Sequence, residues 1–411
     1  MAPSMPERVL REIIKRGVRS IDPQGRRLVQ LDEEAMLAVA RRRTGWHEFG
    51  EDSFREPLRR LLYSLDHEAQ LNFFGRVAAR VDLTRMLCNR LRIEQDRQHH
   101  PDIANEDIRR PVFITGLPRT GSTLLHGLLA QDPVNRVPLH WEVMYPSPPP
   151  ERGTYEVDRR IDLAERQIGW FHRLAPGFRK IHPMSARLPQ ECTVLLSHSF
   201  LSYQFSTSFF VPSYQEWMEA QDLLPAYRIH RQFLQQLQWR CRGERWALKA
   251  PPHLSGLQAL SATYPDAVVI MTHRDPLEVV ASIASLHAVL RRTFSDEVDA
   301  RSVGPEVSEM LVRDLRRGLR ARDAGCLPPE RFLDVWYTDL VDNPLGTVRW
   351  IYSQFDLPLT PTAEARMQQF MAENPQHKYG RHEYSLTQFG LDADGERERF
   401  RVYRERFGFS L

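Results

Sequence analysis

A short segment near residue 120 combines the residue types that bind a phosphate-like anion. Residues 111–129 read PVFITGLPRTGSTLLHGLL, an apolar run, a glycine-containing turn and an amphipathic helical pattern. Gly116 and Gly121 permit a tight turn, and Ser122 and Thr123 place hydroxyls at the start of the predicted helix. Unpaired N–H groups and the positive end of the helix dipole favour an anion at such a position. The segment therefore predicts an anion-binding loop between a strand and a helix.

The loop lacks the lysine that the phosphate-binding loops of ATPases and kinases carry. Gly116 and Gly121 have the spacing of Gly-x4-Gly-Lys-[Ser/Thr], but Ser122 occupies the lysine position and a cation comes earlier, at Arg119. Without that lysine no γ-phosphate clamp remains, which disfavours a nucleotide kinase or hydrolase. That class is the first alternative, and a catalytically silent nucleotide-binding protein is the second.

A second cationic site is predicted where another strand ends. Residues 267–286 read AVVIMTHRDPLEVVASIASL, an apolar run that ends at Arg274 and continues as a helical pattern containing Ser282. Asp275 and Pro276 suit the N-cap and the first position of that helix. Ligands collect at the carboxyl ends of strands in open α/β sheets, and a guanidinium can donate two parallel hydrogen bonds to a phosphate. Arg274 is therefore a candidate phosphate ligand.

The two motifs, in this order, resemble sulfotransferases that use 3′-phosphoadenosine 5′-phosphosulfate (PAPS). The resemblance is closest to the bacterial and tyrosylprotein-type branch, whose loop reads Pro-Arg-[Ser/Thr]-Gly-[Ser/Thr]-Thr, and it covers residues 110–411. It implies that the loop holds the 5′-phosphosulfate, that Arg274 and Ser282 hold the 3′-phosphate, and that a C-terminal loop clamps the nucleotide. The implied nucleotide-binding residues are Arg119, Thr120, Gly121, Ser122, Thr123, Arg274, Ser282, Tyr337, Lys378, Tyr379 and Gly380.

Sulfuryl transfer to a hydroxyl needs a base that accepts the proton of the acceptor. The resemblance indicates Glu142, which lies near the place of the catalytic glutamate in the tyrosylprotein branch. His140 is the second candidate, because the cytosolic branch uses a histidine and imidazole titrates near neutrality. Glu191 and His198, on a helical pattern over residues 190–203, are further candidates.

The reaction also needs a cation that neutralises charge on the leaving oxygen. Lys249 ends the apolar run Trp246–Leu248 in a Lys-x-Pro setting similar to that of the catalytic lysine of the tyrosylprotein branch, and Arg119 is the other candidate. The chemistry requires no metal, and the sequence shows no local metal-ligand spacing.

Short β-rich runs that alternate with long helical patterns after residue 110 predict an α/β fold, a P-loop-type parallel sheet flanked by helices. The expected strands are Pro111–Thr115, Trp246–Leu248, Ala267–Thr272 and Phe332–Trp336. The expected helical stretches are Leu31–Arg43, Pro57–Asn72, Glu151–Leu174, Gln190–Tyr203, Pro225–Cys241, Leu277–Leu290, Val307–Arg322, Leu345–Phe355, Thr362–Glu373 and Gly395–Phe407. Residues 1–105 form a helical N-terminal region and residues 106–411 the α/β domain. Within that domain we expect a helical acceptor-binding insertion at 150–243 and a nucleotide-clamping segment at 374–411.

The composition excludes several classes of protein. The 56 basic and 53 acidic residues leave a net charge of +3, without the excess typical of a nucleic-acid-binding protein. No apolar run is long enough for a membrane span. The four cysteines form no Cys-x-x-Cys pair, which favours a reducing, cytoplasmic setting. Aromatic residues in 200–217 predict an apolar or aromatic small-molecule acceptor, an alcohol or a phenol, and the sequence leaves the oligomeric state open.

Overall fold

The central element of the fold is a parallel sheet. A computed structural model of the chain describes residues 24–174, 184–375 and 384–409. Within these residues five strands form the sheet, in the order β2-β3-β1-β4-β5 and all parallel. The strands are β1 (Val112–Gly116), β2 (Asn135–Arg136), β3 (Arg245–Lys249), β4 (Val268–His273) and β5 (Phe332–Trp336). The predicted α/β class and parallel sheet are confirmed.

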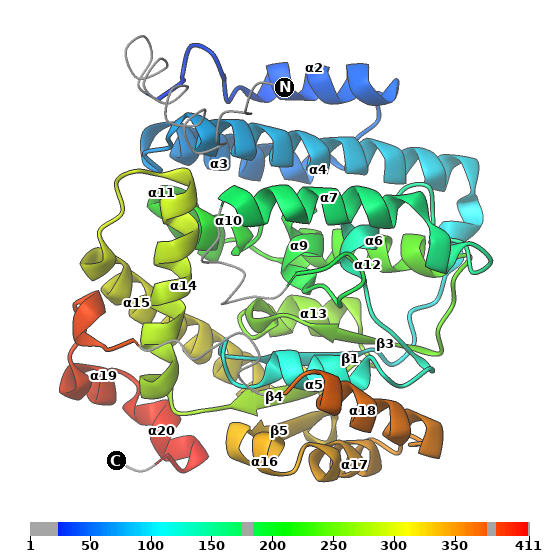
Figure 1. Cartoon of the computed structure of the whole chain (residues 1–411), viewed down its shortest axis with the longest axis vertical. Helices are drawn as coiled ribbons and strands as arrows, with labels where there is room; N and C mark the ends of the chain where they lie inside the picture. Colours follow the sequence, from blue (N-terminus) through cyan, green and yellow to red (C-terminus); the bar gives the residue numbers. More distant parts are fainter. Residues whose placement is uncertain (1–23, 175–183, 376–383, 410–411) are drawn as a thin grey trace, which may run out of the picture.

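Helices cover both faces of the sheet (Figure 1). Alternation along β1 explains this, because Val112 and Ile114 pack into one apolar cluster and Phe113 into the other. The first cluster lies against α5 (Ser122–Leu129), α16 (Tyr337–Asp342), α17 (Pro344–Gln354) and α18 (Pro361–Glu373). The second lies against α12 (Leu224–Gln238), α13 (Leu257–Thr263), α14 (Pro276–Phe294) and α15 (Ala300–Asp323).

The N-terminal helices form an outer layer over the second face (Figure 1). They are α2 (Glu33–Thr44), α3 (Arg55–His67) and α4 (Phe73–His99). Leu61 of α3, Leu87 of α4 and Phe113 of β1 belong to one continuous buried cluster. The N-terminal layer is therefore packed into the same core as the sheet.

Seven further helices complete the described residues. They are α6 (His140–Met144), α7 (Arg159–Leu174), α9 (Cys192–Leu196), α10 (Gln204–Ser208), α11 (Pro212–Glu219), α19 (Ala393–Arg399) and α20 (Arg401–Phe407). The 3-10 turns are Asp52–Phe54, Pro101–Asn105, Tyr155–Val157, Ser197–Ser199, Pro251–His253, Pro329–Arg331 and Thr387–Phe389. Among the helices of the described residues, none combines the length and the apolarity that crossing a bilayer requires.

The connections of β1 and β3 place a crevice beside the predicted anion loop. The chain leaves β1 through α5 on one face of the sheet and leaves β3 through α13 on the other. Neighbouring strands whose connections run to opposite faces open a crevice at their carboxyl ends, where ligands bind. Gly116 ends β1 and Lys249 ends β3, so the predicted anion loop and the predicted catalytic lysine share this crevice.

Three sequence predictions of helices and strands were wrong in detail. The pattern over residues 190–203 is not one helix, because α9 gives way to a 3-10 turn that ends at Phe200 with a φ of +60°. The expected terminal helix over 395–407 is two helices, α19 and α20, which meet at Phe400. The short strand β2 was missed because its two residues, Asn135 and Arg136, form no apolar run.

Candidate active site

The loop after β1 turns tightly between the strand and α5. Gly116 and Gly121 have φ values of +129° and +86°. A Cβ atom on Gly116 would lie 2.3 Å from the carbonyl oxygen of Thr272, so only glycine fits there. The hydroxyl of Thr120 lies 2.6 Å from that of Thr272 and ties the loop to β4. Arg119, with a φ of +69°, projects from the turn as an exposed cation.

A buried lysine and a carboxylate lie at the first turn of α5. Lys249 is 2% exposed, and its Nζ donates to the hydroxyl of Thr123 at 3.3 Å. The same Nζ forms an ion pair with Glu191. Glu191 is half-buried and is the residue from which α9 begins. The crevice therefore holds a helix N-terminus, an ammonium and a carboxylate in contact with one another.

Glu142, the first sequence-based choice of base, is paired with a buried arginine. Its side chain is fully buried and its Oε1 lies 2.5 Å from Nη2 of Arg136. Its Oε2 accepts from Nη1 of Arg136 at 3.1 Å and from the N–H of Leu139 at 2.9 Å. Both oxygens are occupied by a buried bidentate pair and a helix cap, so we interpret Glu142 as a structural residue.

This interpretation makes a stability prediction. In Glu142→Gln the buried guanidinium of Arg136 loses its counter-charge, and breaking such a pair costs about 3–5 kcal/mol. We expect the free energy of unfolding, measured with urea, to fall by that amount while turnover per folded molecule persists. Glu151→Gln is the matched control, because its pair with Arg240 is about half exposed on both sides and is worth about 0–1 kcal/mol. Full stability with lost turnover in Glu142→Gln would restore Glu142 as the base.

His140 lies close to the crevice. Leu139 and Pro189 form an isolated β-bridge, and the N–H of His140 donates to Leu188. This pairing places Nδ1 of His140 2.7 Å from Nε2 of Gln190, the residue that precedes Glu191. His140 thus contacts the residue that precedes Glu191.

His198 is a buried structural histidine, which corrects its candidacy as a base. Its Nε2 lies 3.1 Å from the side-chain amide nitrogen of Asn89, and its Nδ1 lies 3.0 Å from the carbonyl oxygen of Val194. Burial and, to a smaller extent, the charge of Arg85 hold its pKa well below the usual range. Both ring nitrogens are therefore committed to packing contacts with α4 and α9.

Four of the predicted nucleotide-binding residues meet beside the loop. The guanidinium of Arg274 donates to the carbonyl of Arg119 at 3.2 Å and lies 4.1 Å from the ring centroid of Tyr337. The Tyr337 ring also borders Gly121, since a Cβ there would lie 3.3 Å from it. Glu278 pairs with Arg274 at 2.8 Å. An incoming phosphate therefore has to compete with the carboxylate of Glu278.

The helix that follows Arg274 begins as the sequence predicts. Asp275 caps α14, with its side chain accepting from the N–H of Leu277, and Pro276 is the first helical residue. Ser282 lies about two turns further along α14 and is buried. Lys378, Tyr379 and Gly380 lie outside the described residues.

Residues 111–361 match the model of the sulfotransferase family, a span that exceeds half of the chain. The chain belongs to the sulfotransferase family. Sulfotransferase STF1 from Mycobacterium tuberculosis H37Rv has a similar structure, with a TM-score of 0.81 and 35% identity over 90% of this chain and 98% of that one. Sulfotransferase STF9 from Mycobacterium avium is also similar, with a TM-score of 0.82 and 28% identity over 93% of this chain and 98% of that one. Stf3 of Mycobacterium bovis, an omega-hydroxy-beta-dihydromenaquinone-9 sulfotransferase, is 28% identical over 68% of this chain and 71% of its own.

This sulfotransferase is therefore an enzyme that transfers a sulfuryl group, and its family implies PAPS as the donor. The sequence-based choice of fold, family and reaction is confirmed. The structure adds Glu191 to the centre of the site, where the sequence had offered it only as a further candidate. Its sequence signal was its place in Leu188–Cys192, a segment that the resemblance covers.

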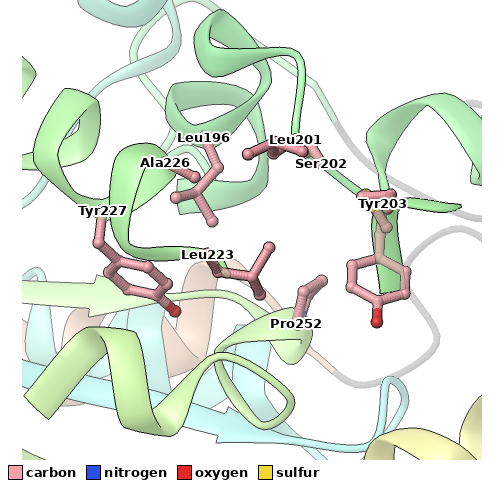
Figure 2. A pocket seen from close by; sticks show the side chains of 9 residues that line it. Leu196, Leu201, Ser202, Tyr203, Leu223, Ala226, Tyr227 and Pro252 are labelled. Atoms are coloured by element: carbon pink, nitrogen blue, oxygen red, sulfur yellow. The ribbon is translucent and has the colours of Figure 1, made fainter. Parts of the chain in front are cut away.

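An apolar pocket of the sulfotransferase opens between the helical insertion and the turn after β3 (Figure 2). Tyr203 lines one side and Tyr227 the other, with Leu223 and Pro252 between them. The remaining lining residues are Leu196, Leu201, Ser202, Met218 and Ala226. Leu196 ends α9 and Pro252 follows Lys249 by three residues. The pocket therefore shares two of its segments with the Glu191–Lys249 pair.

Proposed function

We propose that this enzyme transfers the sulfuryl group of PAPS to a hydroxyl of a small, largely apolar acceptor, with Glu191 as the base. The observation that carries the proposal is the contact of Lys249 with both Glu191 and Thr123. It joins a proton acceptor and a cation to the N-terminus of the helix that follows the anion loop. The missing Walker lysine argues against the kinase or hydrolase alternative.

The residues around the loop fit a nucleotide with two anionic ends. The N–H groups of residues 120–123 and the side chain of Arg119 would hold the 5′-phosphosulfate. Arg274 and Ser282 would hold the 3′-phosphate, beside the ring of Tyr337. Because Gly116 has no Cβ, the loop can lie close to β4; a Cβ there would collide with that strand. In this proposal residues 378–380 belong to the clamping segment 374–411. Residues 1–105 form a helical N-terminal region that precedes the α/β domain 106–411.

Three side chains divide the chemistry. PAPS supplies the sulfuryl group when it is bound. The ionised carboxylate of Glu191 accepts the proton of the acceptor hydroxyl as the new oxygen–sulfur bond forms. Lys249 and Arg119 neutralise charge on the leaving phosphate oxygen. Gln190 and His140 position the backbone that carries Glu191.

The side chains around the small pocket would give a hydrophobic acceptor an apolar contact surface. The pocket lining is largely aliphatic and aromatic, with few polar groups. The relative Stf3 is named for an acceptor that is both hydroxylated and largely apolar, a hydroxylated dihydromenaquinone. We therefore propose an apolar alcohol or phenol as the acceptor, bound by the insertion 150–243. We also propose a reducing, cytoplasmic location, which the four unpaired cysteines support.

The nucleotide site makes its own prediction. Arg274→Ala removes a guanidinium that would bond a phosphate, and hydrogen bonds to charged groups are worth about 1.5–3 kcal/mol. We expect the affinity for 3′-phosphoadenosine 5′-phosphate, measured by calorimetry, to weaken by that amount. Glu278→Gln is the opposite control, because it frees Arg274 from its carboxylate and should leave affinity equal or higher. Unchanged affinity in Arg274→Ala would refute the assignment.

Mass spectrometry of an acceptor panel tests the proposed function directly. The enzyme is incubated with PAPS and with hydroxylated apolar, phenolic and sugar acceptors, and each product is examined for the mass of one added SO₃. Sulfation that favours the apolar alcohols supports the proposal. Preferential sulfation of sugars would overturn the acceptor class, and preferential binding of ATP–Mg²⁺ over PAPS would overturn the donor.

A further inference from the structure

Three metal-ligating side chains converge in the core directly behind the Glu191–Lys249 pair. Cys192 follows Glu191 and is the first residue of α9, His230 lies in the middle of α12, and His253 ends the 3-10 turn after β3. All three are completely buried. One donor atom of each residue lies within 4.8 Å of the donor atoms of the other two. Among the described residues, the group consists of these three side chains.

The two histidines are held so that one nitrogen of each ring has a partner and the other has none. Nδ1 of His253 lies 2.7 Å from the hydroxyl of Tyr227, and Nδ1 of His230 lies 2.8 Å from that of Tyr264. Within the described part of the chain, Nε2 of each histidine is buried without a hydrogen-bond partner. Buried polar atoms are normally paired, so two unpaired nitrogens beside one thiol require an explanation.

A hydrogen bond from the thiol does not account for both nitrogens. Cys192 has one S–H and can satisfy one imidazole at most, which leaves the other without a partner. A tyrosine bonded to Nδ1 is the arrangement that orients Nε2 toward a metal, since ligating histidines usually donate through their second nitrogen. The ring of Phe113 packs edge-on against His253 at 4.9 Å and closes the space from one side.

Burial keeps both imidazoles uncharged, and it also raises the pKa of the Cys192 thiol, so the thiolate has to form together with the bond to the metal. Burial lowers the pKa of His230 to about 3, and burial, His230 and Lys249 hold the pKa of His253 well below its usual range. Both rings are therefore neutral at physiological pH, which is the form that binds metals.

We propose that Cys192 Sγ, His230 Nε2 and His253 Nε2 bind one thiophilic d¹⁰ metal ion, Zn²⁺ or Cu⁺. Thiolate and imidazole are the ligands that both ions prefer. On binding, the thiol of Cys192 loses its proton to solvent and a sulfur–metal bond forms, with no change of oxidation state. Cu⁺ with one thiolate and two neutral imidazoles is uncharged and complete with three ligands. Zn²⁺ needs a fourth ligand such as water.

The ion would hold the active-site residues in position and would take no part in the reaction. It would join α9, α12 and the turn after β3, two of which are attached directly to Glu191 and Lys249. The proposal is independent of the donor, because its three ligands line neither the anion loop nor the nucleotide site.

Titration of the full-length protein tests the site without any activity measurement. Protein stripped with a chelator is titrated with Co²⁺, which reports a thiolate ligand through an intense near-ultraviolet charge-transfer band. Separate anaerobic titrations with Zn²⁺ and Cu⁺ against competing chelators identify the preferred ion. We expect a band that saturates at one ion per chain and a melting temperature that rises with the preferred ion.

Two variants localise the ion. In Cys192→Ser the thiolate band should vanish and the metal-induced rise in melting temperature should be lost. Cys88→Ser removes a buried cysteine of α4 outside the cluster and should keep both signals. If Cys192→Ser does not fold, the wild-type titration still decides, because the absence of stoichiometric binding of all three ions would overturn the proposal. A thiolate band that persists in Cys192→Ser would overturn it as well.

Discussion

Glu191→Gln should lower turnover by about 10²–10⁴-fold, the contribution typical of a positioned general base. Glutamine keeps the size of the side chain and its ability to accept from the ammonium of Lys249, but its amide does not take up the proton of the acceptor. The affinity for 3′-phosphoadenosine 5′-phosphate should stay near that of the wild type, because Arg274 and the loop are untouched. The comparison of single-turnover rates with calorimetric affinities measures both effects on one preparation.

The pH profile separates a catalytic role of Glu191 from a structural one. A carboxylate base acts only in its ionised form, so activity of the wild type should be lost at the acid end of the pH profile, rise with pH and then level off. Glu191→Gln should lose this rising limb, and Glu191→Asp should keep it at a reduced rate. Glu142→Gln provides the contrast, since we expect it to lose stability and to retain the limb. A rising limb that persists in Glu191→Gln would assign the base to another group, with His140 the nearest candidate.

The strand ends and helix starts that frame the candidate site, which the sequence predicts, are contiguous in the chain. The loop over residues 116–123 and the Arg274–Pro276 turn are each a strand end joined to a helix start, and their chemistry is local. Their meeting follows from topology, because β1 and β4 are neighbours in a parallel sheet. Lys249 is predictable for the same reason, since it ends the strand on the other side of β1.

The sequence does not show which carboxylate lies beside Lys249, because that contact depends on a pairing between distant segments. The bridge between Leu139 and Pro189 aligns two stretches that share no local pattern. Glu142 lies in the expected stretch, but Arg136, a residue of the unpredicted strand β2, binds its carboxylate. Cys192, His230 and His253 are likewise far apart in sequence, so no metal-ligand spacing reveals their convergence.

The longest helix of the described residues escaped prediction for a related reason. α4 spans 27 residues, and its buried positions include Arg76, Asn89 and Arg90. Polar residues on the buried side interrupt the apolar periodicity that marks an amphipathic helix. Arg90 is buried because its guanidinium donates to the carbonyls of Phe49, Glu51 and His198, contacts that only the folded chain provides.

Lys249→Met should reduce turnover by about 10²–10³-fold, the scale observed when one donor to a developing oxyanion is removed. Methionine keeps the length of the buried side chain and removes its charge, so the fold should survive better than with a smaller residue. Nucleotide affinity should change much less than turnover, because the charge of the leaving oxygen grows in the transition state. Retention of full activity in Lys249→Met would return the lysine to a structural role.

The double variant Glu191→Gln/Lys249→Met decides whether the two residues act as one unit. They are in contact, so each single change also removes the partner of the other. Residues that act together are strongly non-additive, and losing both then costs little more than losing the more important one. We therefore expect the turnover of the double variant to lie close to that of the worse single variant. Losses that multiply would mean that Lys249 stabilises the leaving group independently of Glu191. In that case the ion pair between Lys249 and Glu191 would be present only before the reaction and would separate before sulfuryl transfer.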